Sequence, residues 1–201
     1  MDSAEAAACL RRIPEGDEGA ARDLFHFLYP LVARLVRSHL PQRTSEEDLC
    51  QIAMVKIFSA AEKFSGKVPI EHWVSRIVIN TCLNQIRAEK VRKELRMSDL
   101  GEAEAEIVEK LSSSAEALDA SDAASARELV ELILTRLEPT DRLLINLLHL
   151  EGRTLSEVAE LTGWNHTAIK VRVFRARRRM RHHIRELEKK DREPKTDPLL
   201  S

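Results

Sequence analysis

Bulky apolar residues repeat at intervals of three and four along this chain, in two blocks separated by a stretch that has few of them. The blocks cover about residues 17–94 and 127–187, with 95–126 between them. Residues at these intervals share one side of an α-helix, and the alternation typical of a strand is not evident. Because Ala, Leu, Glu and Arg also dominate the composition and favour helices, we predict an all-α fold.

The first block predicts three helices separated by two breaks. Pro30 lies inside the first helix, where we expect it to kink or split the helix. The second helix starts after Ser45, whose hydroxyl can cap it ahead of three acidic residues. The third starts near Ile70. The expected buried positions are Leu24, Phe25, Leu28, Leu31, Val32, Leu35 and Val36 in the first helix, and Leu49, Ile52, Ala53, Ile57 and Phe58 in the second.

The charges of the chain are segregated although its net charge is only -1. Residues 1–93 carry a net charge of +2, residues 94–138 one of -8, and residues 139–201 one of +5. This asymmetry predicts a C-terminal end that binds a polyanion and an acidic connector. We therefore divide the chain into a helical domain at 16–94, an acidic flexible linker at 95–126, a second helical domain at 127–187 and a flexible tail at 188–201. The negative charge of the linker should weaken DNA binding by the chain, because the linker can occupy the basic surfaces that DNA would contact.

Cysteine spacing and the N-terminal sequence limit the classes of protein to which the chain can belong. Cys9, Cys50 and Cys82 lie far apart, so they indicate no disulfide framework, metal site or cofactor. Cys50 and Cys82 fall in helical patterns, where we expect them to be small buried apolar groups. The N-terminus lacks a basic start followed by a long apolar run, and no run of 18 apolar residues occurs. We expect a cytoplasmic protein without membrane insertion.

The second block ends in "TLSEVAELTGWNHTAIKVRVFRARRRMRHHI", which joins a short helix to a strongly basic one. Thr154 and Glu157 have the spacing of a capping box. Gly163 can end the short helix, and Asn165 can cap the next one. Ahead of these two helices, another helix is expected, with its cap at Thr140 and its end at Gly152. Two short helices joined by a glycine-containing turn form a helix-turn-helix.

The basic helix of this motif is predicted to enter the DNA major groove with its N-terminal end. Its first residues then meet base edges or nearby phosphates, and its later arginines contact phosphates. The alternative from this segment alone is a solvated basic helix packed on a helical hairpin. The residues predicted to bind DNA are His166, Thr167, Lys170, Arg172, Arg175, Arg177 and Arg178.

Together the two blocks resemble extracytoplasmic-function sigma factors of RNA polymerase. The stretch "LEPTDRLLINLLHLEGRTLSEVAELTGWNHTAIKVRVFRARRRMR" is similar to their C-terminal promoter-binding domain. "EEDLCQIAMVKIF" is similar to the helix that docks on the clamp helices of the polymerase, and "FSGKVPIEHWVSRIVINTCLNQIR" to the segment that opens and reads the −10 element. Ile52 and "SGKVPI" depart from the family pattern, which usually has an acidic residue and "RGxSxF" at these places.

The resemblance implies a sigma factor that binds core RNA polymerase, directs it to promoter DNA and assists melting. The C-terminal domain then binds the −35 element through the residues given above. The implied −10 contacts are Lys67, Arg76, Asn80, Asn84 and Arg87, and the implied polymerase contacts are Glu47, Asp48 and Gln51. For Asn80, a structural hydrogen bond is the competing interpretation. The resemblance also implies an anti-sigma factor as a partner.

The sequence contains few motifs that are typical of other functional classes. No Ser/His/Asp, Cys/His or paired-carboxylate arrangement and no Walker loop is legible, so we expect no enzyme. His182 and His183 are adjacent, and adjacent helical residues point about 100° apart, which makes a poor metal pair. A stand-alone helix-turn-helix regulator and a helical adaptor that binds only proteins stay open as alternatives.

Overall fold

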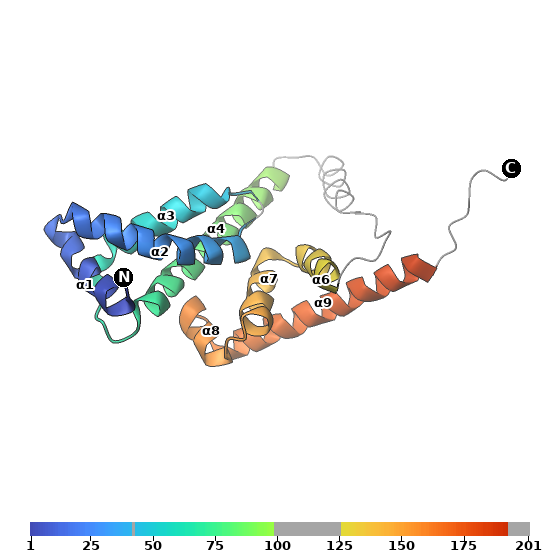
Figure 1. The fold of residues 1–201 in the computed structure, drawn as a ribbon. Coiled ribbons are helices and arrows are strands. Elements are labelled where there is room, and N and C mark those ends of the chain that lie inside the picture. The colour runs from blue at the N-terminus through green and yellow to red at the C-terminus, as the bar shows by residue number, and fades with distance from the viewer. Residues whose placement is uncertain (42, 99–125, 193–201) are drawn as a thin grey trace.

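The computed structural model describes residues 1–41, 43–98 and 126–192, and within this part of the chain the fold is all-α (Figure 1). The N-terminal half contains α1 (Ser3–Arg12), η1 (Ile13–Glu15), α2 (Glu18–Ser38), α3 (Glu46–Ser59), η2 (Ala61–Lys63) and α4 (Ile70–Ser98). The C-terminal half contains α6 (Ala126–Thr135), α7 (Pro139–Ile145), η3 (Asn146–Leu150), α8 (Leu155–Thr162) and α9 (His166–Arg192). The predicted all-helical class is confirmed. Most of the predicted linker and tail lies outside the described residues.

Polar side chains cap the starts of the helices largely as the sequence predicts. The Ser45 hydroxyl accepts a hydrogen bond from the Asp48 amide at 3.1 Å. Thr154 and Glu157 form the predicted capping box. Asn165 caps α9 through a bond of 2.7 Å from the Ala168 amide. The cap predicted at Thr140 is wrong, because Pro139 occupies the first turn and the helix already begins there. Proline suits that position, because its fixed φ matches the helix and the amide hydrogen that it lacks would have no partner in the first turn.

Two features of the N-terminal half differ from the sequence prediction. Helix α1 precedes the predicted domain boundary at residue 16, starts with a capping box at Asp2, and buries Ala6 and Leu10 in the core. Helix α2 runs unbroken past Pro30, so of the two predicted effects, a kink or a split, the split is wrong and the kink stays a prediction. Leu28 and Val32, two residues before and after Pro30, are completely buried. Their packing outweighs the loss of the backbone hydrogen bond that proline cannot donate.

The core of the N-terminal half lies between α1, α2, α3 and α4. Cys50 and Cys82 are buried there as free thiols, as predicted. Burial raises the pKa of the Cys82 thiol to about 12, so it stays protonated. Phe25 and Ile52 were expected in the core but are 37% and 40% exposed, because they lie at the edges of their helices' apolar stripes.

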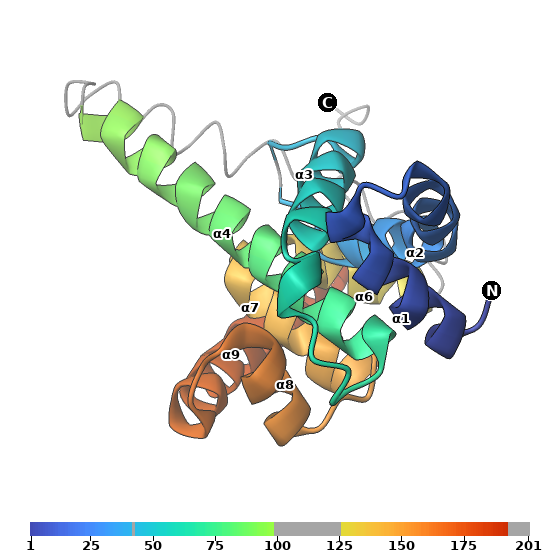
Figure 2. The same cartoon turned by 90° about the vertical axis from the view of Figure 1, so that its left-hand side faces the viewer.

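The two halves pack against each other and share one hydrophobic cluster. Helix α4 lies against α8 and α7, which places the last helix of the first half beside the helix-turn-helix of the second (Figure 2). Residues separated by about half of the chain therefore meet along this boundary, which we call the interdomain seam.

Candidate nucleic-acid interface

Helices α8 and α9 are joined by a tight turn at Gly163-Trp164-Asn165. Gly163 adopts the left-handed conformation, with φ of 71°, which a residue with a side chain adopts only at a cost. Val158 and Leu161 of α8 are fully buried, as are Ile169 and Ala176 of α9. Packing of these residues fixes the angle between the helices, and the predicted helix-turn-helix is present.

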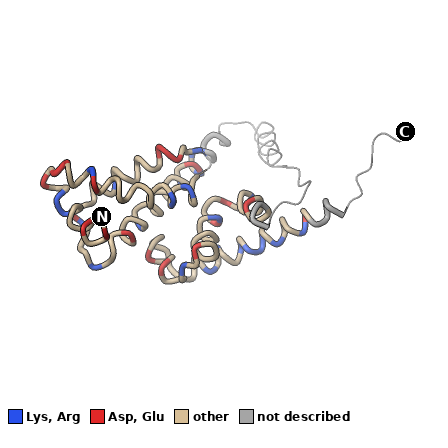
Figure 3. Tube along the Cα trace, viewed as in Figure 1, with Lys and Arg blue, Asp and Glu red and all other residues tan. Residues whose placement is uncertain are grey.

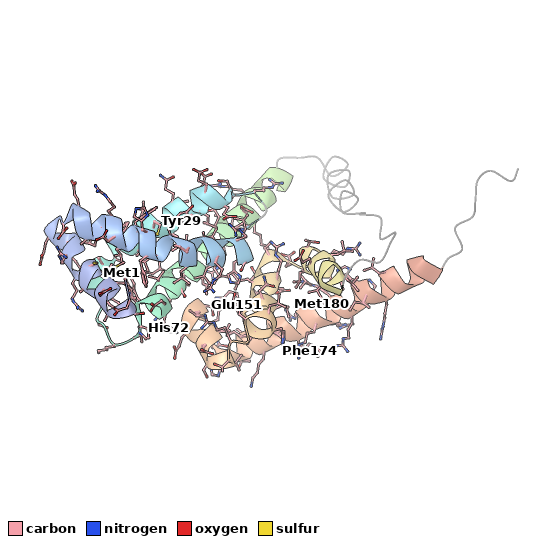
Figure 4. All side chains as sticks on the ribbon, in the orientation of Figure 1. Met1, Tyr29, His72, Glu151, Phe174 and Met180 are labelled. Atoms are coloured by element: carbon pink, nitrogen blue, oxygen red, sulfur yellow. The ribbon has the colours of Figure 1, made fainter. Side chains whose placement is uncertain are left out.

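The exposed side of α9 carries a row of cations, which Figure 3 shows along the length of the helix. Lys170, Arg175 and Arg178 are exposed and make no ion pair with the described residues. His166 and Thr167 are exposed at the start of the helix. Phe174, 62% exposed, lies on this outer side as well (Figure 4). A helix with this outward face can approach a phosphate backbone without first breaking internal contacts.

Two of the residues predicted to bind DNA, Arg172 and Arg177, are exposed and also contact neighbouring residues of their own domain. The Arg172 guanidinium lies 5.0 Å from the centre of the Trp164 ring and 3.6 Å from Asp141. Arg177 Nη2 lies 2.9 Å from the Nε2 of His149. Burial lowers the pKa of that histidine, and the charge of Arg177 lowers it further, so the imidazole accepts the bond in its neutral form.

Asp141 on α7 contacts two arginines of α9 through its carboxylate. Its Oδ2 accepts a bond of 2.8 Å from Arg179, and its Oδ1 lies 3.6 Å from Arg172. The residue is only 5% exposed. Burial raises the pKa of Asp141 above its ordinary value, although the two guanidinium groups act in the opposite direction. The carboxylate holds the two guanidinium groups in place, and the cost of its burial offsets part of the stability that these contacts provide.

The five residues predicted to contact the −10 element fall into two groups. Lys67, Arg76 and Asn84 are exposed, Lys67 in the loop before α4 and the others on the helix. Asn80 and Arg87 face the C-terminal half. Asn80 Nδ2 donates to the carbonyl of Leu161 at 2.8 Å, and the Arg87 guanidinium lies 5.8 Å from the centre of the Trp164 ring.

The residues predicted to bind polymerase lie together on the outer face of α3. Glu47, Asp48 and Gln51 are exposed. Ile52 and Val55, exposed by 40% and 59%, extend this face with apolar surface. On neighbouring α2, the rings of Phe25 and Tyr29 stack at 5.3 Å and are also exposed. The sequence prediction missed this apolar component, since helical spacing cannot tell the core side of a stripe from its exposed edge.

Sequence comparisons place both halves in one family. The family model described as Sigma-70 region 2 matches residues 24–92, and Sigma-70, region 4 matches residues 127–180. The chain belongs to the extracytoplasmic-function sigma factor family. It is 28% identical to the "ECF RNA polymerase sigma-E factor" of Escherichia coli (strain K12) over 181 residues, which is 89% of this chain and 93% of the relative. The "ECF RNA polymerase sigma factor SigM" of Mycobacterium tuberculosis is 26% identical over 82% of this chain and 77% of its own length.

Two solved structures share the fold. One is described as the sigma factor RpoE in complex with the anti-sigma factor NepR from Bartonella quintana. It has a TM-score of 0.52 and 18% identity, over 82% of this chain and 96% of that chain. Another is described as CnrH in complex with the cytosolic domain of CnrY. It has a TM-score of 0.51 and 19% identity, over 90% and 98% of the two chains. None of the described helices of this sigma factor is long and apolar enough to cross a membrane.

Proposed function

We propose that this alternative sigma factor acts in the cytoplasm, binds core RNA polymerase through α3, and reads a promoter through α4 and α9. The observation that carries the proposal is the order of the two family matches along one chain, with a basic helix-turn-helix in the second. The protein supplies recognition, and the chemistry of transcription belongs to the polymerase, so the sigma factor itself is not an enzyme. The anti-sigma factor bound in one structural neighbour makes such a protein an expected partner here.

The −35 element is assigned to α9. His166, Thr167 and Lys170 occupy its first turns, the part of a recognition helix that reaches base edges in the major groove. Arg175 and Arg178 follow on the exposed side and suit phosphates, which position the helix without reading sequence. Arg172 and Arg177 are also exposed on this helix, and their contacts with Asp141 and His149 fix the positions of their charges at the interface.

The −10 element is assigned to α4 and the loop before it. Lys67, Arg76 and Arg87 offer charge to the backbone, while Asn80 and Asn84 offer amides that can bond to bases. Trapping an unstacked base in a protein site offsets the cost of unpairing it, which is a few kcal/mol. Because Asn80 Nδ2 donates to the Leu161 carbonyl of the other half, this bond must break before the amide can donate to a base, whereas Arg87 is already exposed.

Polymerase binding is assigned to Glu47, Asp48 and Gln51 with the apolar surface beside them. We expect Asp48→Ala combined with Gln51→Ala to weaken binding to core polymerase about tenfold or more, because a hydrogen bond to a charged group contributes about 1.5–3 kcal/mol. Fluorescence anisotropy of the labelled protein titrated with core enzyme measures this. Glu15→Ala combined with Glu62→Ala, both at exposed positions away from α3, should bind as the wild type does. Equal affinities for all three proteins would contradict the assignment.

In-vitro transcription tests the proposed function as a whole. Purified core polymerase and this protein, supplied with a library of genomic promoter fragments, should start transcription at defined sites that bare polymerase does not use. A stand-alone helix-turn-helix regulator would bind DNA without displacing another sigma factor from core enzyme. A helical adaptor that binds only proteins would show no salt-dependent DNA affinity in any complex.

Asp141 gives a separate prediction about promoter discrimination. Asp141→Asn keeps the shape of the side chain but releases Arg172 and Arg179, so we expect the ratio of promoter to scrambled-DNA affinity to fall about threefold to tenfold. The free energy of unfolding should change by less than about 1 kcal/mol, because burial already opposes the ionised carboxylate. Filter binding of holoenzyme to both DNAs and urea unfolding measure the two effects. Glu138→Gln, the same charge change three residues earlier, should leave the affinity ratio unchanged.

A further inference from the structure

A small network of hydrogen bonds ties the connection between α2 and α3 to α4. The Thr44 hydroxyl donates to Glu89 Oε1 at 2.7 Å and accepts a bond of 2.7 Å from Gln85 Nε2. The Arg43 amide donates to the same Glu89 oxygen at 3.3 Å. We call Thr44, Gln85 and Glu89 the loop anchor. All of its bonds lie within the N-terminal half, so they do not depend on how the two halves pack.

The geometry of the loop anchor leaves its side chains little freedom. A threonine hydroxyl has one hydrogen to donate, and Thr44 directs it at Glu89 while Gln85 occupies a lone pair of the same oxygen. Gln85 and Glu89 are four residues apart, so they share one side of α4. The three side chains are partly buried, where hydrogen bonds are stronger than in water. The network therefore fixes both the position and the direction of the chain at Thr44.

The chain that leaves the loop anchor becomes the polymerase-binding end of α3. Ser45 is the next residue, and its hydroxyl caps α3 by accepting a bond of 3.1 Å from the Asp48 amide. In the first turn, Glu46 accepts two bonds from Arg37 of α2, at 2.7 and 3.1 Å. The start of α3, which also carries Glu47, is thus held by α4 and by α2, and Figure 2 shows the three helices together.

Helix α4 carries the residues assigned to the −10 element on a neighbouring side. They follow one another at intervals of four, four and three, which places them on one face; they are Arg76, Asn80, Asn84 and Arg87. Asn84 directly precedes Gln85, and adjacent helical residues point about 100° apart. The loop anchor and this −10 face therefore share turns of α4, and a shift of the helix at Gln85 moves the −10 face with it.

We propose that the loop anchor positions the −10 face of α4 relative to the polymerase-binding end of α3, so that promoter opening depends on it. The inference rests on the proposed function, which assigns these two surfaces to DNA and to polymerase. Docking on polymerase fixes α3, and the loop anchor transmits that position to α4. A site that traps an unstacked base needs its groups held close to the required geometry by supporting hydrogen bonds. Thr44, Gln85 and Glu89 are positioning residues, which act through the helices that they join.

Other contacts keep α3 packed on α4 when the loop anchor is removed. Leu49, Ala53 and Ile57 of α3 are completely buried in the core. Lys56 Nζ also donates to Thr81 Oγ1 of α4 at 3.3 Å. Loss of the loop anchor should therefore leave the N-terminal half folded, and loosen only the alignment of the two helices at the start of α3.

The test removes the loop anchor from either side in the holoenzyme. Thr44→Val deletes the hydroxyl but keeps the shape of the side chain, and Gln85→Met combined with Glu89→Met deletes its partners on α4. For both we expect the rate of opening of a duplex promoter to fall about threefold to tenfold, because supporting hydrogen bonds are lost. Fluorescence of 2-aminopurine in the −10 element measures that rate. Affinity for core polymerase should not change, and transcription from a promoter with a pre-opened −10 element should equal that of the wild type.

Two substitutions serve as controls, and a combined variant tests the coupling. Thr44→Ser keeps the hydroxyl and should open the promoter as the wild type does. Thr135→Val makes the same chemical change as Thr44→Val at an exposed threonine, whose hydroxyl donates to the Leu132 carbonyl of its own helix. It should have no effect. Thr44→Val added to the α4 pair should open the promoter no more slowly than either alone, because partners in one network are not additive.

Slow opening of the duplex, with normal polymerase binding and normal use of the pre-opened promoter, would support the loop anchor. Wild-type opening rates, additive effects in the combined variant, or an equal loss on both templates would overturn it. Circular dichroism shows whether each variant is folded, and if one is not, the variant on the other side of the network decides. Failure of the proposed function looks different: the wild type then starts transcription with core polymerase on neither template.

Discussion

Replacing Lys170, Arg175 and Arg178 together by alanine is expected to weaken binding of the holoenzyme to a −35 duplex by about a hundredfold or more. The three cations lie on the exposed side of α9 and make no ion pair with the described residues, so their removal leaves the domain's own contacts intact. A direct contact to a base or phosphate contributes about 1 kcal/mol or more, and separated contacts add. Fluorescence anisotropy with labelled promoter DNA measures the loss.

Salt dependence provides a second readout for the same variant. Binding to each phosphate releases condensed counterions, so the slope of log affinity against log salt should become shallower by about 0.9 for each phosphate that the variant no longer neutralises. The matched control is Arg11→Ala, Arg22→Ala and Arg43→Ala, which removes the same charge from exposed positions of the N-terminal half. The control is compared with the α9 variant in both measurements. If its affinity fell and its salt slope became shallower by the same amounts, the effect would come from net charge and not from a DNA-binding face on α9.

The local rules of helix formation explain why so much of the fold could be predicted. Thr154, Gly163 and Asn165 act through residues at most four positions away, and each has the capping role that its sequence spacing predicts. The buried residues of α8 and α9 likewise follow from helical periodicity. Glu47, Asp48 and Gln51 share one exposed helix face for the same reason.

Contacts between residues that lie far apart in the chain could not be predicted in this way. Asp141 meets Arg179 across 38 positions, and Asn146 meets the Ser38 carbonyl across 108. No periodicity links such residues, and neither a lone asparagine nor the π-helical turn beside it has a sequence signature. The same holds for the contacts of Arg172 with Trp164 and Asp141, which helical spacing does not predict. Pairing of distant residues depends on tertiary packing, which a single sequence does not encode locally.

The stability of the C-terminal half sets a limit on promoter recognition, and Leu144 is the residue that tests it. Leu144 lies on α7, is 0% exposed, and belongs to the hydrophobic cluster that supports α9. Leu144→Ala should lower the free energy of unfolding by about 2–5 kcal/mol, through lost apolar burial and the cavity left behind. Urea unfolding of the full chain, followed by circular dichroism, measures this change.

The matched control is Leu150→Ala, the same chemical change at a leucine that is 59% exposed six residues later. Its effect should stay within about 0.5 kcal/mol, because a surface substitution removes little burial. Since small domains are stable by only about 5–15 kcal/mol, the Leu144 variant should also lose −35 binding on warming before the wild type does. Equal unfolding curves for the two variants would mean that α7 does not support α9, and the recognition helix would then need another source of rigidity.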